Sequence, residues 1–205
     1  METHMEKVSY IIGRQIGGDF KNQGIEVVNE AFVKGFETSI SGDESEISLE
    51  ESQKIMQAFQ VEMAAKAHKM QKTASEANVK AGEEYLAANK DKEGVCVTTT
   101  GLQYKVIKQG QGATPTLTQT VEVHYEGTLI DGSVFDSSYQ RGQTTSFPVN
   151  GVIAGWTEAL QLMKEGDIWE LTIPSNLAYG ERGAGAMIGP NCVLNFKVEL
   201  IKVVE

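Results

Sequence analysis

The sequence predicts a two-part α+β protein: an all-α N-terminal half, one long connecting helix, and an antiparallel β-sheet wrapped around a single helix. All four prolines lie beyond residue 110. Apolar residues recur at helical spacing in the first half and alternate, as in strands, in the second. Because proline interrupts helices, these patterns separate two kinds of fold. We place the boundaries at residues 1–46 for the helical module, 47–94 for the connecting helix and 95–205 for the sheet domain.

Two short helices are predicted in the first module. Residues 5–24 place apolar side chains on one helical face and end at Gly24, a residue suited to a C-cap. Residues 29–42 predict the second helix, with Asn29 as its N-cap. The apolar faces of the two helices consist of Val8, Ile11, Ile12, Ile16, Phe32, Phe36 and Ile40.

A third, much longer helix is predicted from Ser48 to about Asn89, with Gly82 as its one interior glycine. Ser48 and Glu51 have the spacing of a capping box at its start. At 1.5 Å per residue the helix would be roughly 60 Å long, so it cannot fold back on itself. Its later apolar stripe consists mostly of alanines and is too thin to hold a core. Its early stripe is stronger and consists of Ile55, Met56, Phe59 and Met63.

The early stripe and the two short helices need more partner surface than about 45 residues of one chain can supply. We therefore expect the N-terminal helices to form a dimerisation module that pairs with a second copy. The alternative is a monomer with a three-helix knot and a frayed stalk.

The second half predicts five or six antiparallel strands around one helix. Residues 102–110 alternate between the two faces of a strand. Residues 120–138 predict two strands joined by Asp131 and Gly132, a strong hairpin signal. The other predicted elements are a short strand at 146–150, a helix closed by Gly166, and strands at 167–174 and 192–204.

Charge and composition exclude several classes of partner. The formal net charge is −10, from 11 basic against 17 acidic residues (−6) over 1–95 and 7 against 11 (−4) over 96–205. Without a basic stripe, we expect no nucleic-acid partner and no anionic membrane surface. No apolar run reaches about 18 residues, and the N-terminus lacks the pattern of a secretory leader. We therefore expect a cytoplasmic protein, unless a leader has been removed, with Cys96 and Cys192 as reduced thiols.

Most catalytic chemistries have no support in the residues present. The three histidines, His4, His68 and His124, do not combine with other ligands at the usual spacing of a metal site. There is no nucleophile elbow and no Walker-type phosphate loop. We therefore expect neither a metal ion nor a cofactor, and we interpret His124 as a structural residue in a strand.

The sequence does supply aromatic and aliphatic residues beside glycine-rich loops. With a few polar members, such a set is typical of an apolar ligand pocket. The polar candidates are Asp136, Arg141 and Tyr179. The aromatic and aliphatic candidates are Tyr125, Phe135, Phe147, Val152, Ile153, Trp156, Ile188 and Phe196.

The second half contains the motifs "VHYEGTLIDGSVFDSS", "FPVNGVIAGWTEALQLMKEGD", "LTIP", "LAYGERGAG" and "NFKVELI". In their order and with these gaps, the motifs resemble the FKBP family of peptidyl-prolyl cis–trans isomerases. The resemblance covers residues from about 101 to 205. The N-terminal half resembles the two-domain macrophage-infectivity-potentiator type of bacterial FKBP, in which a helical module makes a V-shaped homodimer. The lack of a leader favours its cytoplasmic branch.

The resemblance implies roles for individual residues. Trp156 would be the floor on which the substrate proline rests. The Ile153 backbone N–H and the Tyr179 hydroxyl would bind substrate carbonyls, and Asp136 would provide a polar wall, unless it is a purely structural acid. The remaining implied substrate-binding residues are Tyr125, Phe135, Arg141, Phe147, Val152, Ile188 and Phe196.

As a function, the resemblance implies an isomerase that accelerates X-Pro rotation in folding proteins, with client binding by the dimeric N-terminal module. Tacrolimus and rapamycin would inhibit it. The alternative is a dimeric holdase that uses the FKBP-like domain only to recognise proline. Gly189, Ala184 and Thr145 depart from many relatives, and they bear on substrate preference more than on the reaction.

Overall fold

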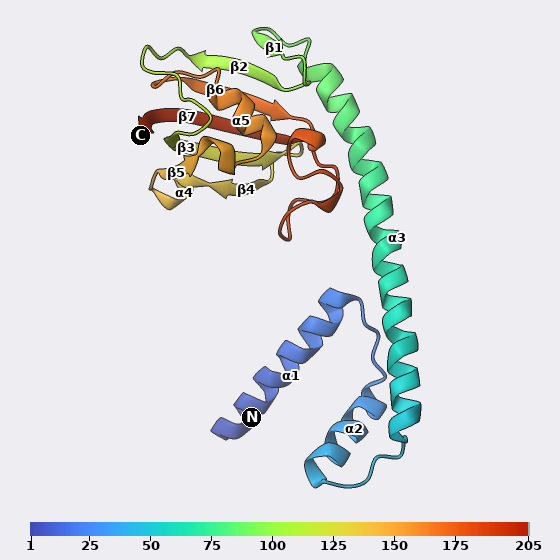
Figure 1. The fold of residues 1–205 in the computed structure, drawn as a ribbon. Coiled ribbons are helices and arrows are strands. Elements are labelled where there is room, and N and C mark those ends of the chain that lie inside the picture. Colours follow the sequence, from blue (N-terminus) through green and yellow to red (C-terminus); the bar gives the residue numbers. More distant parts are fainter. Residues whose placement is uncertain (205) are drawn as a thin grey trace. The chain divides into compact units, whose positions relative to one another are not determined.

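A computed structural model describes residues 1–204 of the chain (Figure 1). The chain divides into two compact units, Met1–Glu62 and Met63–Glu205, and the division falls within the long helix. The unit that holds the sheet therefore includes the second half of this helix, which the sequence pattern assigns to a connector. Among the helices within residues 1–204, none is both long enough and apolar enough to cross a membrane.

The first unit consists of α1 (His4–Gln23), α2 (Asn29–Ser41) and the start of α3 (Leu49–Asn89). Gly24 closes α1 in the left-handed conformation, with φ of 66°, as predicted. At the other end Thr3 and Glu6 form a capping box, which the sequence pattern did not single out.

The starts of α2 and α3 test two predicted caps. Asn29 is the first residue of α2 and not its N-cap; Val28 takes that position, in extended conformation and without a side-chain cap. The prediction for Asn29 is therefore wrong by one residue. The Ser48 hydroxyl does accept a hydrogen bond from the Glu51 N–H, at 3.2 Å, and α3 begins directly after it.

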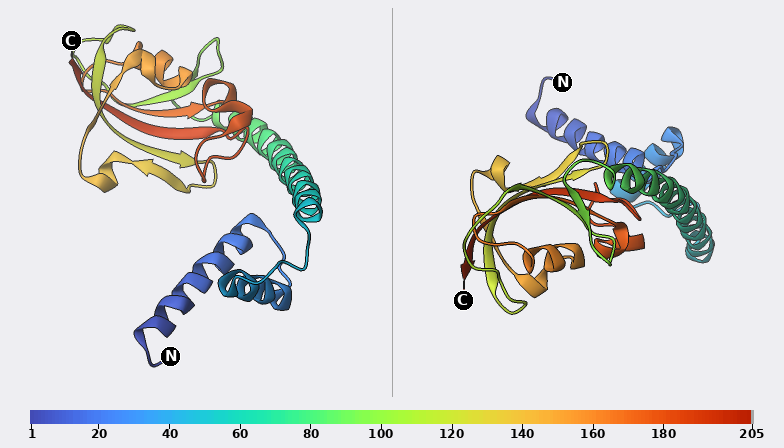
Figure 2. Two further views of the ribbon diagram at one scale, coloured as in Figure 1. Left: turned by 60° about the horizontal axis from the view of Figure 1, so that its bottom comes forward. Right: turned by 90° about the horizontal axis from the view of Figure 1, so that it is seen from above.

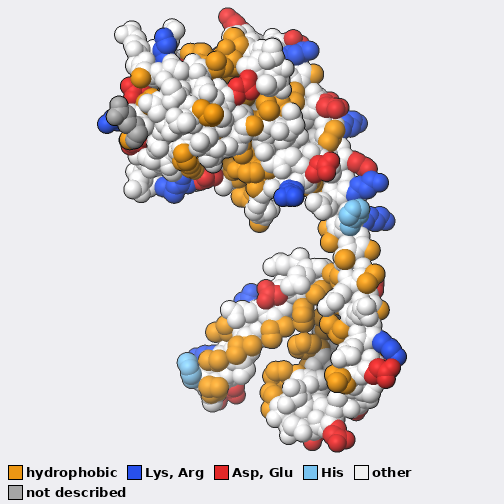
Figure 3. Space-filling view, viewed as in Figure 1, with side chains coloured by type: hydrophobic (Ala, Val, Ile, Leu, Met, Phe, Trp, Pro, Cys, Tyr) orange, Lys and Arg blue, Asp and Glu red, His pale blue; other side chains and the backbone are white. Residues whose placement is uncertain are grey.

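The helices α1 and α2 bury none of their residues within this chain. Hydrophobic side chains form a row along α1 and continue onto α2 (Figure 3). Folded proteins rarely leave so large an apolar surface open to water. The largest exposed apolar residues of these two helices are Met5, Tyr10, Ile11, Ile12, Phe32, Val33, Phe36 and Ile40.

The second unit is built on a seven-stranded antiparallel sheet with the order β1-β2-β6-β7-β3-β4, in which β5 also pairs with β3. The sheet curves around the short helix α5 (Ala154–Leu160) (Figure 2). The strands are β1 (Val95–Val97), β2 (Gln103–Lys108), β3 (Thr120–Leu129), β4 (Val134–Ser137), β5 (Thr145–Pro148), β6 (Ile168–Ile173) and β7 (Leu194–Val204). This confirms the predicted α+β fold.

The core lies between the concave face of the sheet and α5. On β3 the buried side chains alternate, as expected for a strand with one face toward a core. Gly155 lets α5 approach the sheet, because a Cβ there would lie 2.5 Å from Ile173 Cγ2. The core includes Leu102, Val121, Val123, Val149, Trp156, Leu160, Met163, Leu171, Ile173, Leu194, Val198 and Leu200.

The helix α5 is shorter than predicted, because it ends at Leu160 and not at Gly166. The buried Asp167 carboxylate explains the early end, since it accepts backbone N–H groups from Lys164, at 2.7 Å, and Gly110, at 2.6 Å. These bonds hold residues 164–167 in a turn. Gly166, with φ of 92°, belongs to this turn.

Short helical turns complete the second unit. The α4 turn (Ser138–Arg141) follows β4 directly and was not predicted. Three 3-10 turns, η1 (Val149–Gly151), η2 (Ser175–Leu177) and η3 (Gly180–Arg182), lie in the connections before α5 and after β6.

Candidate functional site

A cavity of about 400 Å³ opens between the sheet and the N-terminus of α5. Its walls come from β3, β4, β5, β7, the residues around η1 and α5, and the residue before η3. Nine of the eleven predicted site residues line it, and Gly151 lines it as well. The lining residues are Tyr125, Phe135, Asp136, Phe147, Gly151, Val152, Ile153, Trp156, Tyr179 and Phe196.

Trp156 forms the centre of an aromatic cluster at this cavity. Its ring, which is 4% exposed, meets Tyr125 and Phe196 edge-on with centroids 5.3 Å away, and Phe147 at 5.9 Å. Phe135 in turn packs edge-on against Phe196 at 5.5 Å. Edge-to-face contacts of this kind fix the orientation of each ring, so the apolar walls are preformed.

Gly127 in β3 makes room for two of these rings. A Cβ at this position would lie 2.5 Å from Phe135 Cζ and 2.7 Å from Phe196 Cε1. Only glycine therefore allows both phenyl rings to pack over the strand. Sequence reasoning missed this residue, although a glycine within a strand is itself a signal of close approach.

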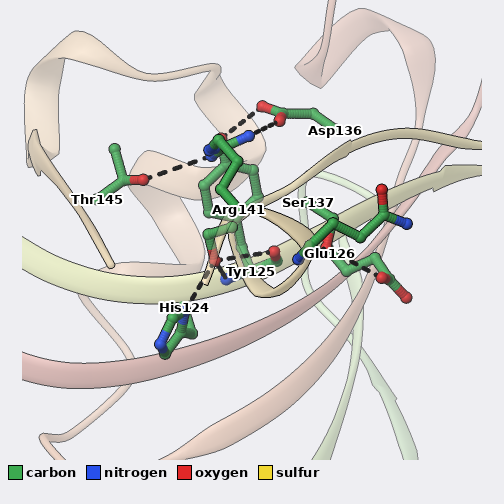
Figure 4. A network of polar contacts seen from close by, with 9 residues as sticks. His124, Tyr125, Glu126, Asp136, Ser137, Arg141 and Thr145 are labelled. Carbon is green, nitrogen blue, oxygen red and sulfur yellow. Dashed lines mark hydrogen bonds and ion pairs between the residues drawn. The ribbon is translucent and has the colours of Figure 1, made fainter. Parts of the chain in front are cut away.

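The polar edge of the cavity is a three-residue network (Figure 4). The Tyr125 hydroxyl donates to Asp136 Oδ2 at 2.5 Å, and Arg141 pairs with Asp136 Oδ1. Arg141 Nη2 also donates to the Tyr125 hydroxyl at 3.0 Å. Arg141 is thus behind the carboxylate and does not line the cavity, unlike the other two residues.

The network keeps Asp136 ionised. Burial raises the pKa of Asp136, but hydrogen bonds from Tyr125 and Arg141 and the charge of Arg141 together hold it below its ordinary value. Burial raises the pKa of Tyr125, and its hydrogen bond to Asp136 raises it further. Near neutral pH the cavity therefore presents one carboxylate and a neutral phenol.

Behind the network, Ser138 holds the backbone of β3. The Ser138 hydroxyl accepts the Tyr125 N–H at 2.7 Å and donates to the Tyr125 carbonyl at 3.1 Å. His124 Nδ1 lies 2.9 Å from the same hydroxyl (Figure 4). Sequence reasoning did not select Ser138, because a serine in a "DSS" turn resembles a solvent-exposed loop residue.

Two polar groups at the cavity have no partner within residues 1–204. The Ile153 N–H, just before α5, and the Tyr179 hydroxyl donate no hydrogen bond to this part of the chain. Tyr179 is 41% exposed. Both groups are therefore free to donate to a ligand that enters the cavity.

Ile188 does not line the cavity. It is half-buried, packs against the core cluster, and forms a β-bridge with Ala184. Gly151, which does line the cavity, was missed; a Cβ there would lie 2.6 Å from Pro148 Cγ, so the turn into α5 needs glycine. The lining set has no serine, cysteine, histidine or lysine, the side chains that most often act as covalent nucleophiles.

Two family models together match most of the chain. The model described as FKBP-type peptidyl-prolyl cis-trans isomerase matches residues 111–201. The model described as the domain amino terminal to FKBP-type peptidyl-prolyl isomerase matches residues 5–106.

Individual proteins match over nearly the full length. "Outer membrane protein MIP" of Legionella longbeachae is 44% identical, over 99% of this chain and 87% of that protein. "FKBP-type 22 kDa peptidyl-prolyl cis-trans isomerase" of Escherichia coli K12 is 45% identical, over 98% of this chain and 97% of that protein. The crystal structure of FkpA from Escherichia coli matches with a TM-score of 0.75 and 35% identity, covering 100% of this chain and 98% of that one.

The prediction of a cytoplasmic protein is contradicted by these relatives, since one that aligns with nearly the whole chain is named an outer membrane protein. The assignment to a cytoplasmic branch fails for the same reason. The prediction rested on the lack of a leader pattern and of long apolar runs, and neither feature identifies the compartment of a protein.

Proposed function

This chain belongs to the FKBP-type peptidyl-prolyl cis–trans isomerases, and we propose that it accelerates X-Pro rotation in protein substrates within the cavity above Trp156. The resemblance of the whole chain to the two-domain bacterial type is confirmed by the two family models and by relatives named Mip and FkpA. The observation that carries the site proposal is a preformed aromatic box with free hydrogen-bond donors at its edge.

Rotation about an X-Pro bond is slow because the C–N bond has partial double-bond character, with a barrier of roughly 18–20 kcal/mol. The planar amide is polar, and water stabilises it. At the twisted transition state conjugation is lost and the carbonyl is less polar. An apolar cavity therefore destabilises the planar form relative to the twisted one, and each ~1.4 kcal/mol of this difference is a tenfold gain in rate.

The aromatic walls suit this task. We assign desolvation of the amide and placement of the proline ring to the floor, Trp156, which is nearly fully buried within the cluster. The side walls that would enclose the ring are Phe135, Phe147, Val152 and Phe196.

The polar groups would bind the peptide on either side of the rotating bond. We assign substrate carbonyls to the Ile153 N–H and the Tyr179 hydroxyl, both free at the cavity. The ionised Asp136, held by Tyr125 and Arg141, would face the carbon of the twisted carbonyl and stabilise the transition state relative to the planar cis and trans forms.

The decisive test is a protease-coupled isomerisation assay of the full chain on a short Ala-Pro peptide. We expect acceleration, inhibition by tacrolimus or rapamycin, and at least a tenfold loss in kcat/KM for Trp156→Ala. A folded full-length protein that gives no acceleration would refute the proposal.

We further propose that the first unit forms a homodimer and retains client proteins. Its support is the row of apolar side chains on α1 and α2, which stay largely exposed within residues 1–204. A second copy of the same surface is the simplest complement, and a dimer presents two cavities to one client. The holdase alternative would give client binding without catalysis, so the peptide assay separates the two.

A further inference from the structure

The second half of α3 contacts the isomerase domain through one helical face. The positions that are at least half-buried repeat at intervals of three and four residues, as one face of a helix requires. Except for glycine, the chief members of this docking face are polar and bond across to the domain. The docking face consists of Ser75, Asn78, Gly82, Tyr85 and Asn89.

The C-terminal part of this face is packed closely against the sheet. Asn89 Nδ2 donates to Gln103 Oε1 at 2.9 Å, and Tyr85 Oη accepts from Asn195 Nδ2 at 3.0 Å. At Gly82 the helix comes so near that a Cβ would lie 2.8 Å from Val193 Cγ2. The helix is therefore seated on the domain by shape as well as by hydrogen bonds.

The N-terminal part of the docking face, Ser75 and Asn78, holds the loop between η3 and β7, which we call the rim loop (residues 183–193). Asn78 Nδ2 donates to the Pro190 carbonyl at 2.8 Å and to Cys192 Sγ at 3.4 Å. Asn191 Nδ2 donates to Ser75 Oγ at 2.8 Å. Two side chains of α3 thus hold three consecutive residues of the loop.

The same loop residues connect to the cavity. The Asn191 N–H donates to the Gly180 carbonyl at 2.8 Å, and Gly180 directly follows Tyr179, which lines the cavity. Asn191 has a φ of 56°, the one left-handed non-glycine residue within 1–204. Asparagine adopts this conformation more readily than most residues, and hydrogen bonds of its backbone N–H and its side chain fix it in place.

We infer that Ser75 and Asn78 of α3 are positioning residues for the isomerase: they hold Pro190–Cys192, and through Asn191 and Gly180 they set the place of Tyr179 at the cavity. The inference rests on the proposed function, in which the Tyr179 hydroxyl binds a substrate carbonyl. The helix then does more than connect two units, because its second half is part of the catalytic unit.

The test uses the full-length chain with the double substitution Ser75→Ala/Asn78→Ala. Its matched control is Thr73→Ala/Lys80→Ala, on exposed positions of the same helix. We expect the first variant to raise KM for an X-Pro peptide about fivefold with little change in kcat. The reason is that the contact of the Tyr179 hydroxyl with the substrate is weakened while Trp156 stays in place. The control should match the wild type.

A double-mutant cycle distinguishes positioning from a general loss of structure. In a Tyr179→Phe background the Ser75→Ala/Asn78→Ala effect on KM should disappear, since the hydroxyl that the loop positions is already gone. A KM effect that persists at full size in this background would overturn the inference. An unchanged KM for Ser75→Ala/Asn78→Ala in the chain that keeps Tyr179 would also overturn it.

Hydrogen exchange of residues 180–193 gives a readout that does not need activity. We expect faster exchange of these amides in Ser75→Ala/Asn78→Ala than in the wild type and the control. If the wild type were inactive, the proposed function would fail while this measurement still tested the contact. Unchanged exchange would overturn the inference whatever the activity.

Discussion

At the scale of single residues, the catalytic role of the Asp136 carboxylate is the part of the proposed mechanism that most needs a test. Its side chain is 41% exposed, yet two neighbours hold it in place. It is the one charged side chain within residues 1–204 that lines a mostly apolar cavity. Its role as a side chain and its ionisation can therefore be tested separately.

Substitution of Asp136 tests the polar wall. Asp136→Ala should lower kcat/KM for X-Pro peptides by more than tenfold and leave the fold intact, because the aromatic contacts of Trp156 do not involve it. The matched control is Asp131→Ala in the β3–β4 hairpin turn, which should be close to wild type in rate. An Asp136→Ala protein with full activity would show that this acid is purely structural.

The pH dependence follows from the lowered pKa of Asp136. The ionised form is favoured in the folded protein, so its contribution to stability is full above the unfolded pKa of about 3.9 and is lost as pH falls through the lower folded value. Activity should follow the same carboxylate. We expect a flat kcat/KM from neutral pH down to about pH 4 and a decline below it, measured by exchange NMR without a protease.

Removal of Arg141 tests the direction of this shift. Arg141→Ala takes away a hydrogen bond and a positive charge that lower the pKa of Asp136, so the acidic decline should move to higher pH. An acidic limb that stays in place, or that moves to lower pH, would contradict the network.

The indole of Trp156 permits a graded test of the floor. Its buried Nε1–H has no hydrogen-bond partner within residues 1–204, so its removal leaves no acceptor unpaired. Trp156→Ala should destabilise the protein by about 3–5 kcal/mol, and Trp156→Phe by clearly less. Urea denaturation followed by far-UV circular dichroism would measure both; equal losses would mean that the indole N–H and not ring volume matters.

At the scale of elements, the strands and the hairpin could be predicted because alternation and the Asp131-Gly132 pair are local signals. The true end of α5 could not, because Asp167 stops it through bonds to Gly110, which is distant in sequence. The docking face of α3 was missed for a related reason. Periodicity analysis follows apolar residues, and here Ser75, Asn78 and Asn89 make the contacts.

Most of the cavity could be predicted, since nine of its residues come from motifs typical of one family. What the motifs could not supply is the support behind them. Ser138 fixes β3 through backbone bonds, and Gly127 acts through an absent side chain. Ser138 has no feature that marks a site in a linear sequence, and a glycine within a strand, such as Gly127, signals close approach without saying which side chains approach it.

The seat of α3 on the sheet domain gives a prediction at this scale. Gly82→Ala improves helix propensity but forces a methyl group against Val193, so we expect a net loss of stability of about 1 kcal/mol or more. Both tryptophans lie in the sheet domain, and their fluorescence during denaturation would report it. Val193→Ala makes room for the methyl, so the double variant should be more stable than the sum of the single effects; simple additivity would contradict the close approach.

At the scale of the whole molecule, the proposed dimer separates two activities. Phe36 is 55% exposed on α2, and Phe36→Lys should convert a dimer to a monomer in sedimentation. Glu37→Lys, an exposed neighbour, is the control. The monomer should turn over short peptides within about twofold of the wild type but accelerate refolding of a proline-limited protein at least tenfold less, because client retention is lost.

Equal losses on peptide and protein substrates would refute this division of labour, and so would a wild-type protein that sediments as a monomer. A monomer that retained full activity on both substrates would show that the exposed helical surface serves another purpose.

The position of β7 determines when the cavity can form during synthesis of the chain. This last strand lies between β6 and β3 and carries Phe196 of the cavity, so the sheet has no continuous centre without it. Synthesis delivers the chain from the N-terminus, and contacts between distant residues form late. The nascent protein therefore cannot assemble its cavity until β7 has emerged from the ribosome, and a catalyst of slow folding steps is itself inactive while this strand is missing.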